Sequence, residues 1–427
     1  MRRCSMEITR RTHASFYPGY RLFTVILIII AAFAPILSPP AEILPGVWQI
    51  MTSRSLLVTD YMAVGGAGAM LINGALAGLF AMLIMMLIGV KPNGATIMSL
   101  WITVGFGFFG KNVLNMLPLI TGVWLYTRFQ KEPLIDYSLA ALMVATLSPV
   151  VSELAFGFGV LNPLAGGALA IAVGIVTGFV FPMLAAFTVR VHDGYCLYNT
   201  GFAGGILAMF LVAIFKAVGI TIETAQLWAI GKDIELAAMV YILSVVLIAA
   251  GFIMGRGSDI KHGLRQINAS SGRLVSDYLA LYGGSAYINM GALGIISTSL
   301  MLVLGIDING PTLGGIFTIV GFGCFGKHLR NVLPVMAGAI LSSIMNISQI
   351  SDPGNALAIL FSTALAPIAG RFGPFWGIIA GFLHVSIVQH TGLLPNGLNL
   401  YNNGFAAGFD AMVLVPVILS LKRARKE

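Results

Sequence analysis

The chain has 427 residues, of which 58% are hydrophobic and 9% charged, and its mean hydropathy is +0.92. Because a soluble domain carries about 25% charged residues, this composition excludes a sizeable aqueous domain and indicates an integral membrane protein. The formal net charge of +8 collects at the chain ends and in a few loops. It forms no basic stripe interleaved with aromatic residues, so we expect no nucleic-acid partner.

The N-terminus carries a basic cluster before the first apolar run, at residues 22–37. This order of charge and apolar residues resembles a signal peptide. No small-residue cleavage site follows, and Ser38-Pro39-Pro40 comes instead. We therefore predict a retained first span with a cytoplasmic N-terminus, in line with the positive-inside bias. The basic residues are Arg2, Arg3, Arg10, Arg11 and Arg21.

A glycine-rich run that ends in lysine interrupts an apolar stretch and occurs twice. Residues 105–112 read Gly-Phe-Gly-Phe-Phe-Gly-Lys-Asn, and residues 321–328 read Gly-Phe-Gly-Cys-Phe-Gly-Lys-His. A Leu-Tyr-Asn-x-Gly-Phe motif at 197–202 likewise recurs at 400–405. Such internal repeats predict a duplicated chain, with a first membrane repeat over residues 1–222 and a second over 223–427. Further matches are Asn73 with Asn289, Asn115 with Asn331, Gly122 with Gly338, and residues 174–179 with 377–382.

Each repeat divides into seven apolar segments separated by charged, Pro-rich or Asn/Gly-rich breaks. Several are shorter than the roughly 20 residues of a full span, and the third segment of each repeat carries the glycine break. We prefer an all-α membrane protein with seven spans per repeat and broken or re-entrant third segments. The alternative is five spans per repeat plus re-entrant hairpins. The segments lie near 21–38, 62–90, 94–110, 113–129, 134–152, 163–189 and 203–221, then 235–254, 281–305, 311–326, 331–348, 355–370, 373–390 and 405–421.

The charged loops predict that the two repeats are inverted. The basic N-terminus, residues 256–273 and the basic C-terminus should lie in the cytoplasm, and the acidic loop between the repeats should lie outside. An odd number of crossings per repeat follows, so a pseudo-two-fold axis in the membrane plane should relate the repeats. We expect a multi-pass protein of the inner (cytoplasmic) membrane with both termini in the cytoplasm.

Lys111 and Lys327 follow the glycine breaks at Gly107 and Gly323. A lysine at the bilayer centre costs roughly 2.5–3.5 kcal/mol on insertion scales, so a lysine kept there usually has a function. If the break forms two half-helices near the midplane, their free backbone N–H groups and the lysine can receive a polar or anionic solute. The alternative is that each lysine marks a loop and reaches for the membrane surface.

Four asparagines are the other expected substrate contacts. Asn73 and Asn289 lie inside glycine-rich spans, where an amide needs a partner, either a neighbouring helix or a passing solute. Asn199 and Asn402 belong to the two Leu-Tyr-Asn-x-Gly-Phe motifs, and we expect them to face the pore. Asparagine beside glycine also makes ordinary turns, which is the alternative for this pair.

Asp60, Asp277 and His384 are candidates for coupling transport to protons or cations. Each aspartate follows a hydroxyl residue just before the second segment of its repeat, so it either caps a helix or titrates during transport. His384 lies in an apolar segment, where a histidine either relays protons or packs as a satisfied core residue. Glu153 and Arg371 come at similar places in the two repeats and could form an ion pair between them.

The sequence contains no enzyme motif. There is no zinc-spaced set of His and Cys, no Gly-x-Ser-x-Gly nucleophile elbow, and no phosphate-binding loop, because each Gly-Lys pair is followed by Asn or His. Cys4, Cys196 and Cys324 are far apart and odd in number, so neither a disulfide framework nor a metal-binding pair is predicted. We expect no cofactor, no metal and no enzymatic activity.

The two doubled motifs resemble those of an uncharacterised prokaryotic family of polytopic membrane proteins, a domain of unknown function, over most of the chain. More locally, residues 69–78 resemble the Tyr/Phe-Asn-Gly-x-Leu-x-Gly element of urea channels, which are also inverted duplications. The first repeat lacks the aromatic residue before Asn73, and the second has Met290 in place of the glycine. Seven-plus-seven inverted-repeat transporters of anions and nucleobases, with broken third helices, offer an analogy of architecture.

These features together predict a transporter or channel for a small polar or anionic solute, with its site at the repeat interface near the bilayer midplane. The expected partners are the solute and the lipid bilayer, and a homo-oligomer is left open. A membrane-embedded enzyme for lipid-linked substrates is one alternative, and it would bring His192, Asp193 and His390 together. A non-transporting sensor or structural protein is another, and it would show a dry, fully packed repeat interface.

Overall fold

The computed structural model describes residues 17–157, 162–224, 226–255, 257–274, 276–345 and 349–424. Every element in these ranges is helical, and the only β contacts are isolated bridges. The predicted all-α class is therefore confirmed. Several residues that carried predictions lie outside these ranges: Arg2, Arg3, Cys4, Arg10, Arg11, Arg256, Arg425 and Lys426.

The described helices follow the expected apolar segments. In the first half they are α2 (Pro18–Leu37), α3 (Pro40–Met51), α4 (Tyr61–Gly65), α5 (Ala67–Leu87), α6 (Gly94–Gly107), α7 (Val113–Gln130), η2 (Leu134–Tyr137), α8 (Ser138–Met143), η3 (Val144–Leu147), α9 (Ser148–Ser152), η4 (Glu153–Gly157), α10 (Pro163–Val191) and α11 (Asn199–Ala217). In the second half they are α12 (Asp233–Met254), α13 (Gly257–Ala269), α14 (Tyr278–Tyr282), α15 (Gly284–Val303), α16 (Gly310–Phe322), α17 (Leu329–Met345), α18 (Pro353–Phe361), η5 (Ser362–Leu365), α19 (Ala366–Phe372), α20 (Pro374–Thr391) and α21 (Asn402–Ala424).

Nine helical stretches within the described residues are long and apolar enough to cross a membrane. This makes the chain a multi-pass membrane protein. The glycine-broken helices are shorter: α6 has 14 residues and α16 has 13. At 1.5 Å per residue they reach about 20 Å, less than the roughly 30 Å hydrocarbon core. The number of full crossings therefore stays a prediction.

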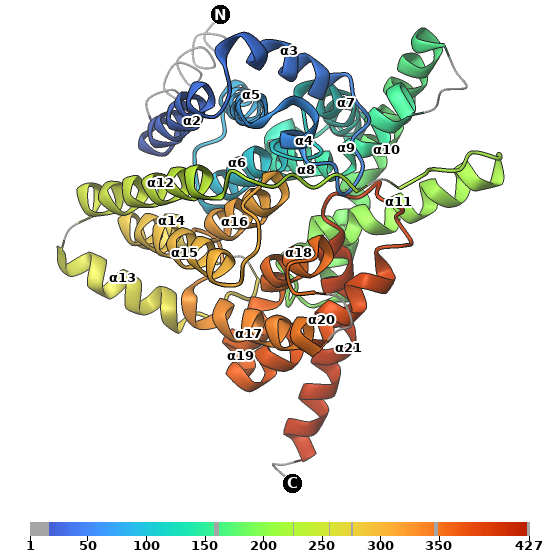
Figure 1. The fold of residues 1–427 in the computed structure, drawn as a ribbon. Helices are drawn as coiled ribbons and strands as arrows, with labels where there is room; N and C mark the ends of the chain where they lie inside the picture. The colour runs from blue at the N-terminus through green and yellow to red at the C-terminus, as the bar shows by residue number, and fades with distance from the viewer. Residues whose placement is uncertain are drawn as a thin grey trace, which may run out of the picture.

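The two halves of the chain occupy different parts of the molecule. Most helices of the first half lie in the upper part of Figure 1, and most helices of the second half lie in the lower part. Several helix pairs pack across the division, most extensively α6 against α16 and α11 against α21, and α2 also packs against α12. The pairs α6–α16 and α11–α21 frame the interface between the halves.

Glycines allow the helices of each half to touch. Gly122 and Gly178 lie where α7 crosses α10, and a Cβ on either would lie within 2.2 Å of a backbone carbonyl oxygen on the facing helix. Gly338 and Gly381 do the same between α17 and α20, where the corresponding distances are 1.9 and 1.8 Å. Membrane helices associate through such small residues because lipid supplies no hydrophobic drive.

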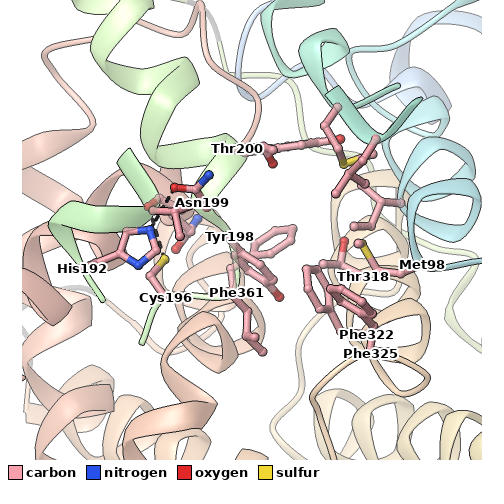
Figure 2. Close-up of a pocket in the computed structure, with 18 of the residues that line it drawn as sticks. Met98, His192, Cys196, Tyr198, Asn199, Thr200, Thr318, Phe322, Phe325 and Phe361 are labelled. Atoms are coloured by element: carbon pink, nitrogen blue, oxygen red, sulfur yellow. Dashed lines mark hydrogen bonds between the residues drawn. The ribbon is translucent and has the colours of Figure 1, made fainter. Parts of the chain in front are cut away.

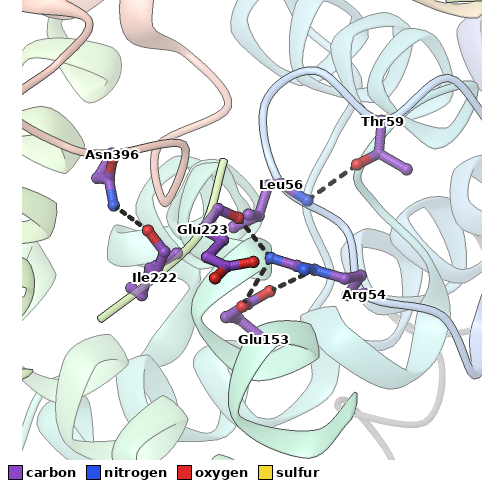
Figure 3. A network of polar contacts seen from close by, with 7 residues as sticks. All are labelled: Arg54, Leu56, Thr59, Glu153, Ile222, Glu223 and Asn396. Carbon is purple, nitrogen blue, oxygen red and sulfur yellow. Dashed lines mark hydrogen bonds and ion pairs between the residues drawn. The ribbon is translucent and has the colours of Figure 1, made fainter. Parts of the chain in front are cut away.

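The ion pair suggested between Glu153 and Arg371 is wrong. Glu153 binds Arg54 instead, with its carboxylate oxygens 3.0 and 3.2 Å from the guanidinium nitrogens. Arg54 also donates to the Glu223 carbonyl oxygen at 2.6 Å, so it ties two segments of the first half to the linker between the halves (Figure 3). The carboxylate of Glu153 is buried, and proximity in the fold decided its partner.

Candidate functional site

Each glycine break places a lysine just after the end of a short helix, α6 in the first half and α16 in the second. Gly110 and Gly326 adopt φ of +92° and +106°, a region that favours glycine, and the chain reverses there. The next backbone N–H, on Lys111 or Lys327, then donates to the Phe106 or Phe322 carbonyl oxygen at 2.9 Å. Both lysine side chains are fully buried.

An asparagine from the preceding helix holds each break. The Asn73 amide donates to the carbonyl oxygens of Gly107, at 2.6 Å, and Lys111, at 2.8 Å. Asn289 makes the same two bonds in the second half, to Gly323 at 2.7 Å and to Lys327 at 2.8 Å. These carbonyls are left without a helical partner by the break, so the amides replace the missing bonds. The contacts match the interhelical role expected for this pair, and contact with a solute stays a prediction.

The lysines bind tyrosines of the opposite half. Lys111 Nζ donates to the Tyr401 hydroxyl, and Lys327 Nζ donates to the Tyr198 hydroxyl. Each ammonium also lies over the ring of its tyrosine, 4.7 Å and 4.4 Å from the ring centroids. Lys327 has a further bond of 2.7 Å to Thr363 Oγ1. The two lysines thus meet tyrosines, and not each other.

A cavity of about 190 Å³ lies between the halves and is lined from both. Tyr198 and Tyr401 form part of its wall, so each buried lysine sits one side chain behind the cavity surface. Figure 2 shows Tyr198 and Phe361 between the His192 and Asn199 pair on one side and Phe322 on the other. An apolar pocket with a few polar groups is typical of small-molecule sites.

Aromatic rings connect the two tyrosines with the broken helices. The Tyr401 ring lies 4.4 Å from the Phe106 ring, and the Tyr198 ring lies 5.1 Å from the Phe322 ring, measured between centroids. Phe106 and Phe322 come from the ends of α6 and α16, so each ring pair also joins opposite halves. The same chemistry is present twice around one cavity.

Asn199 lines the cavity, and its amide oxygen and nitrogen both bind other side chains or backbone of the first half. Its oxygen lies 2.8 Å from Thr188 Oγ1 and 2.9 Å from His192 Nε2, and its nitrogen donates to the Ala185 carbonyl oxygen at 2.8 Å. Burial lowers the pKa of His192, and the hydrogen bond to Asn199 partly offsets this effect. Asn402 is buried but does not line the cavity, whereas its neighbour Asn403 does.

His384 belongs to a buried polar chain that leads to the cavity. Its Nδ1 lies 2.7 Å from Asp410 Oδ2, and its Nε2 lies 3.1 Å from Asn403 Oδ1. The side chains of His384 and Asp410 are 0% and 1% exposed. The other oxygen of Asp410 has no hydrogen-bond partner among the described residues. A carboxylate buried between helices usually has a function in membrane proteins.

Asp60 and Asp277 lie at helix starts, as one of the two interpretations expected. Each accepts a backbone N–H at the start of its own short helix, Asp60 from Met62 and Asp277 from Ala280. Each also reaches the broken helix of the other half: Asp277 accepts from Gly94 N at 2.9 and 3.0 Å, and Asp60 accepts from Gly310 N. A carboxylate at a helix N-terminus complements the helix dipole.

Asp60 is also deeply buried, between α3 and α4. Its burial raises its pKa to about 6, although three backbone N–H groups favour the charged form. A coupling role for Asp60 or Asp277 stays a prediction.

Of the three residues expected for a membrane-embedded enzyme, only His192 lines the cavity. His192 bonds Asn199, Asp193 lies 3.8 Å from Arg273, and the exposed His390 bonds the Ser386 carbonyl oxygen. Among the described residues no group of three or more His, Cys, Asp or Glu could hold a metal ion.

Sequence reasoning missed three side chains that the structure places at the site. Tyr198 and Tyr401 stand in the doubled Leu-Tyr-Asn-x-Gly-Phe motif, and their repetition was a sufficient signal. Asp410 lies within the apolar segment 405–421, where a lone carboxylate by itself indicates a functional residue.

Comparison with family models gives one match, described as "Protein of unknown function (DUF1576)", over residues 39–217 and 257–420. The chain belongs to this family. The matched residues cover most of the chain and fall once in each half, with the matched helices α6 and α16 inside them. The comparison with curated proteins found no match, and neither did the comparison with solved structures. The expected membership of an uncharacterised family of polytopic membrane proteins is thereby confirmed.

Proposed function

We propose that this protein is a transporter or channel that carries a small polar or anionic solute between two inverted repeats, through the cavity at their interface near the bilayer midplane. The observation that supports it most is the crosswise pairing of Lys111 with Tyr401 and of Lys327 with Tyr198 around that cavity. A site built from matching parts of two halves is the usual arrangement in transporters with inverted repeats.

The lysine–tyrosine pairs suit an anion or a polar acceptor. A tyrosine hydroxyl that accepts a bond from an ammonium still has its own O–H proton to donate. The nearby positive charge polarises that O–H and strengthens the bond it gives to a solute. Tyr401 would therefore present a strong donor to the cavity. The Tyr198 hydroxyl also lies 3.3 Å from Thr363 Oγ1, which itself donates to the Leu360 carbonyl oxygen, so Tyr198 would exchange its bond to Thr363 for one to a solute. The lysines would supply charge without contacting the solute directly.

The cavity also favours transport over the two alternatives. A sensor or structural protein was expected to have a fully packed interface, and an enzyme was expected to gather His192, Asp193 and His390 at one place. We further propose an inner-membrane location with both termini cytoplasmic, because the basic loops and the acidic linker follow the positive-inside pattern.

The test is uptake by proteoliposomes that contain the purified full-length protein. The probes are radiolabelled urea, uracil, succinate, sulfate and inorganic phosphate. We expect at least one probe to enter faster than in empty liposomes. A variant with Lys111→Met and Lys327→Met should lose that uptake by at least about tenfold, because the tyrosines lose their polarising charge. Lys91→Met with Lys216→Met, which changes two exposed lysines, is the matched control.

Two results would contradict the proposal. One is that no probe moves faster than in empty liposomes. The other is that the double variant at Lys111 and Lys327 transports as fast as the control variant while inserting equally well.

A further inference from the structure

A second, more polar pocket opens beside the central cavity. It has a volume of about 660 Å³ and is lined by residues from the loop after α10, the loop before α14, the end of α19 and the end of α21. Its described lining residues include four cations, Arg273, Arg371, Lys422 and Arg423, and a single acid, Asp193. Four positive charges and one negative charge leave the pocket with an excess of three positive charges.

Asp193 neutralises only one of these cations. The Arg273 guanidinium lies 3.8 Å from the Asp193 carboxylate and also donates to the Asp193 carbonyl oxygen at 2.8 Å. Asp193 already pairs with Arg273, and no second acidic side chain lines the described part of the pocket to balance Arg371, Lys422 and Arg423. Like charges held together in this way favour the approach of an anion.

Two aromatic rings hold part of this charge in place. Tyr195 and Phe372 are stacked, with centroids 5.3 Å apart. The Arg273 guanidinium lies 4.4 Å from the Tyr195 ring centroid, and Lys422 Nζ lies 4.9 Å from the Phe372 ring centroid. Such contacts restrain the cations before any ligand arrives, which reduces the entropy lost on binding.

The basic pocket and the central cavity share the same loops. Asp193 and Tyr195 line the pocket, whereas Gly194 between them lines the cavity. Arg273 lines the pocket, and the next residue, Leu274, lines the cavity. An anion held in the pocket would thus sit at an entrance to the cavity.

The matching place in the other half has no such excess of charge. Asn396 and Gly397 correspond to Asp193 and Gly194, and Gly397 packs on the loop that follows α3. The arginine of that loop, Arg54, is already paired with the buried Glu153 (Figure 3). The excess positive charge of the basic pocket is therefore not a feature that the two repeats share.

We propose that this pocket binds a phosphate-bearing anion at the entrance to the central cavity. Planar guanidinium groups match the oxygen geometry of phosphate in a bidentate manner, and a lysine adds a compact charge. A volume of about 660 Å³ leaves room for a group larger than phosphate itself. The phosphate belongs either to a free solute or to a lipid headgroup. The proposal concerns binding alone and so goes beyond transport through the cavity.

The experiment measures two probes with the full-length protein. Equilibrium dialysis in a neutral detergent measures binding of radiolabelled inorganic phosphate against chloride at constant ionic strength. Native mass spectrometry measures retention of phosphatidylglycerol against phosphatidylcholine. The test variant is Arg371→Gln with Arg423→Gln, and the matched control is Arg128→Gln with Lys131→Gln, two exposed cations at the end of α7.

We expect the wild-type protein to bind at least one probe and the test variant to bind it at least about tenfold more weakly, because two charge-assisted contacts are lost. Binding of free phosphate would identify a solute site, and selective retention of phosphatidylglycerol would identify a headgroup site. The proposal is overturned if the wild type binds neither probe, or if the control variant loses as much affinity as the test variant.

Discussion

Lys111 and Lys327 are buried and have no acidic partner among the described residues, and tyrosine hydroxyls take that place. A carboxylate would neutralise each lysine and leave little field for a solute. A tyrosine oxygen accepts the hydrogen bond of the lysine in its ammonium form without neutralising it, so that charge would act in the surrounding low-dielectric space. At the residue scale, the proposed binding site rests on this choice of partner.

His384 and Asp410 form a different kind of contact, a buried pair with no counterpart in the first half. Aligning the two Leu-Tyr-Asn-x-Gly-Phe motifs places Phe181 opposite His384 and Leu207 opposite Asp410, and both of these residues are apolar. The pair links α20 to α21 beside the cavity residue Asn403. A group that accepts a proton here would be well placed to sense the occupant of the cavity.

We predict that His384 and Asp410 depend strongly on each other for stability. His384→Leu or Asp410→Leu alone leaves a polar group buried without its partner and should lower the free energy of unfolding by about 3–5 kcal/mol. The double variant removes both groups and should lose much less than the sum. Unfolding in SDS titrations measures all three variants, with His390→Leu, an exposed histidine of the same helix, as control. Additive losses would show that the two side chains do not interact.

At the scale of elements, the interface depends on the close crossing of α6 and α16. Gly105 on α6 faces Gly314 and Phe317 on α16, and an added Cβ would lie 2.9 Å from Phe317 Cβ and 3.1 Å from the Gly314 carbonyl oxygen. Neither atom is the end of a flexible side chain, so the helices would have to separate. Separation would also move Phe106 and the following lysine.

We therefore expect Gly105→Ala to destabilise the protein by about 1–3 kcal/mol, the usual cost of overpacking. Gly167→Ala in α10 is the control, because no atom lies within 4 Å of its added Cβ. A change from glycine to alanine in an open helical position should stabilise by up to about 1 kcal/mol. Thermal melting in detergent compares the two variants. Equal melting temperatures would argue against a tight crossing of α6 and α16.

At the scale of the molecule, the two halves share their contacts but differ in charge. The asparagine that holds each glycine break and the aspartate at each helix start occur once in each half, and the two lysine–tyrosine pairs join the halves in matching ways. The four cations of the basic pocket and the His384–Asp410 pair come from the second half only. Matched contacts in the two halves suit a protein that alternates between two equivalent conformations. The unmatched charges would make the two sides of the membrane different for a solute.

The proposed inverted arrangement makes a direct topological prediction. Thr224 lies in the linker expected outside, and Lys261 lies on α13 in a region expected inside; both are exposed. In a cysteine-free background, Thr224→Cys should react with a membrane-impermeant maleimide in intact cells, and Lys261→Cys should react only after permeabilisation. Labelling of both positions from the same side would rule out the inverted topology, because a linker and an inner loop cannot then lie on opposite faces.

Composition and local pattern by themselves determined the membrane class, the helical segments and the position of the glycine breaks. Those properties depend on neighbouring residues, and hydropathy and glycine content report them directly. The duplicated motifs also identified the lysines, the asparagines and the helix-start aspartates. Even the partners missed there, Tyr198 and Tyr401, stood in a motif that the repeat had marked.

Only the tertiary structure decided which side chains meet. Lys111 and Tyr401 are 290 positions apart, and Lys327 and Tyr198 are 129 apart, so no local spacing encodes their contact. The pairing follows from how α6 crosses α16 and α11 meets α21 at the interface of the halves. The same packing placed Glu153 beside Arg54 and brought four cations to the wall of one pocket. Burial makes the lysine–tyrosine contacts and the pairing of Glu153 consequential, because charge is expensive to leave unpartnered in a membrane.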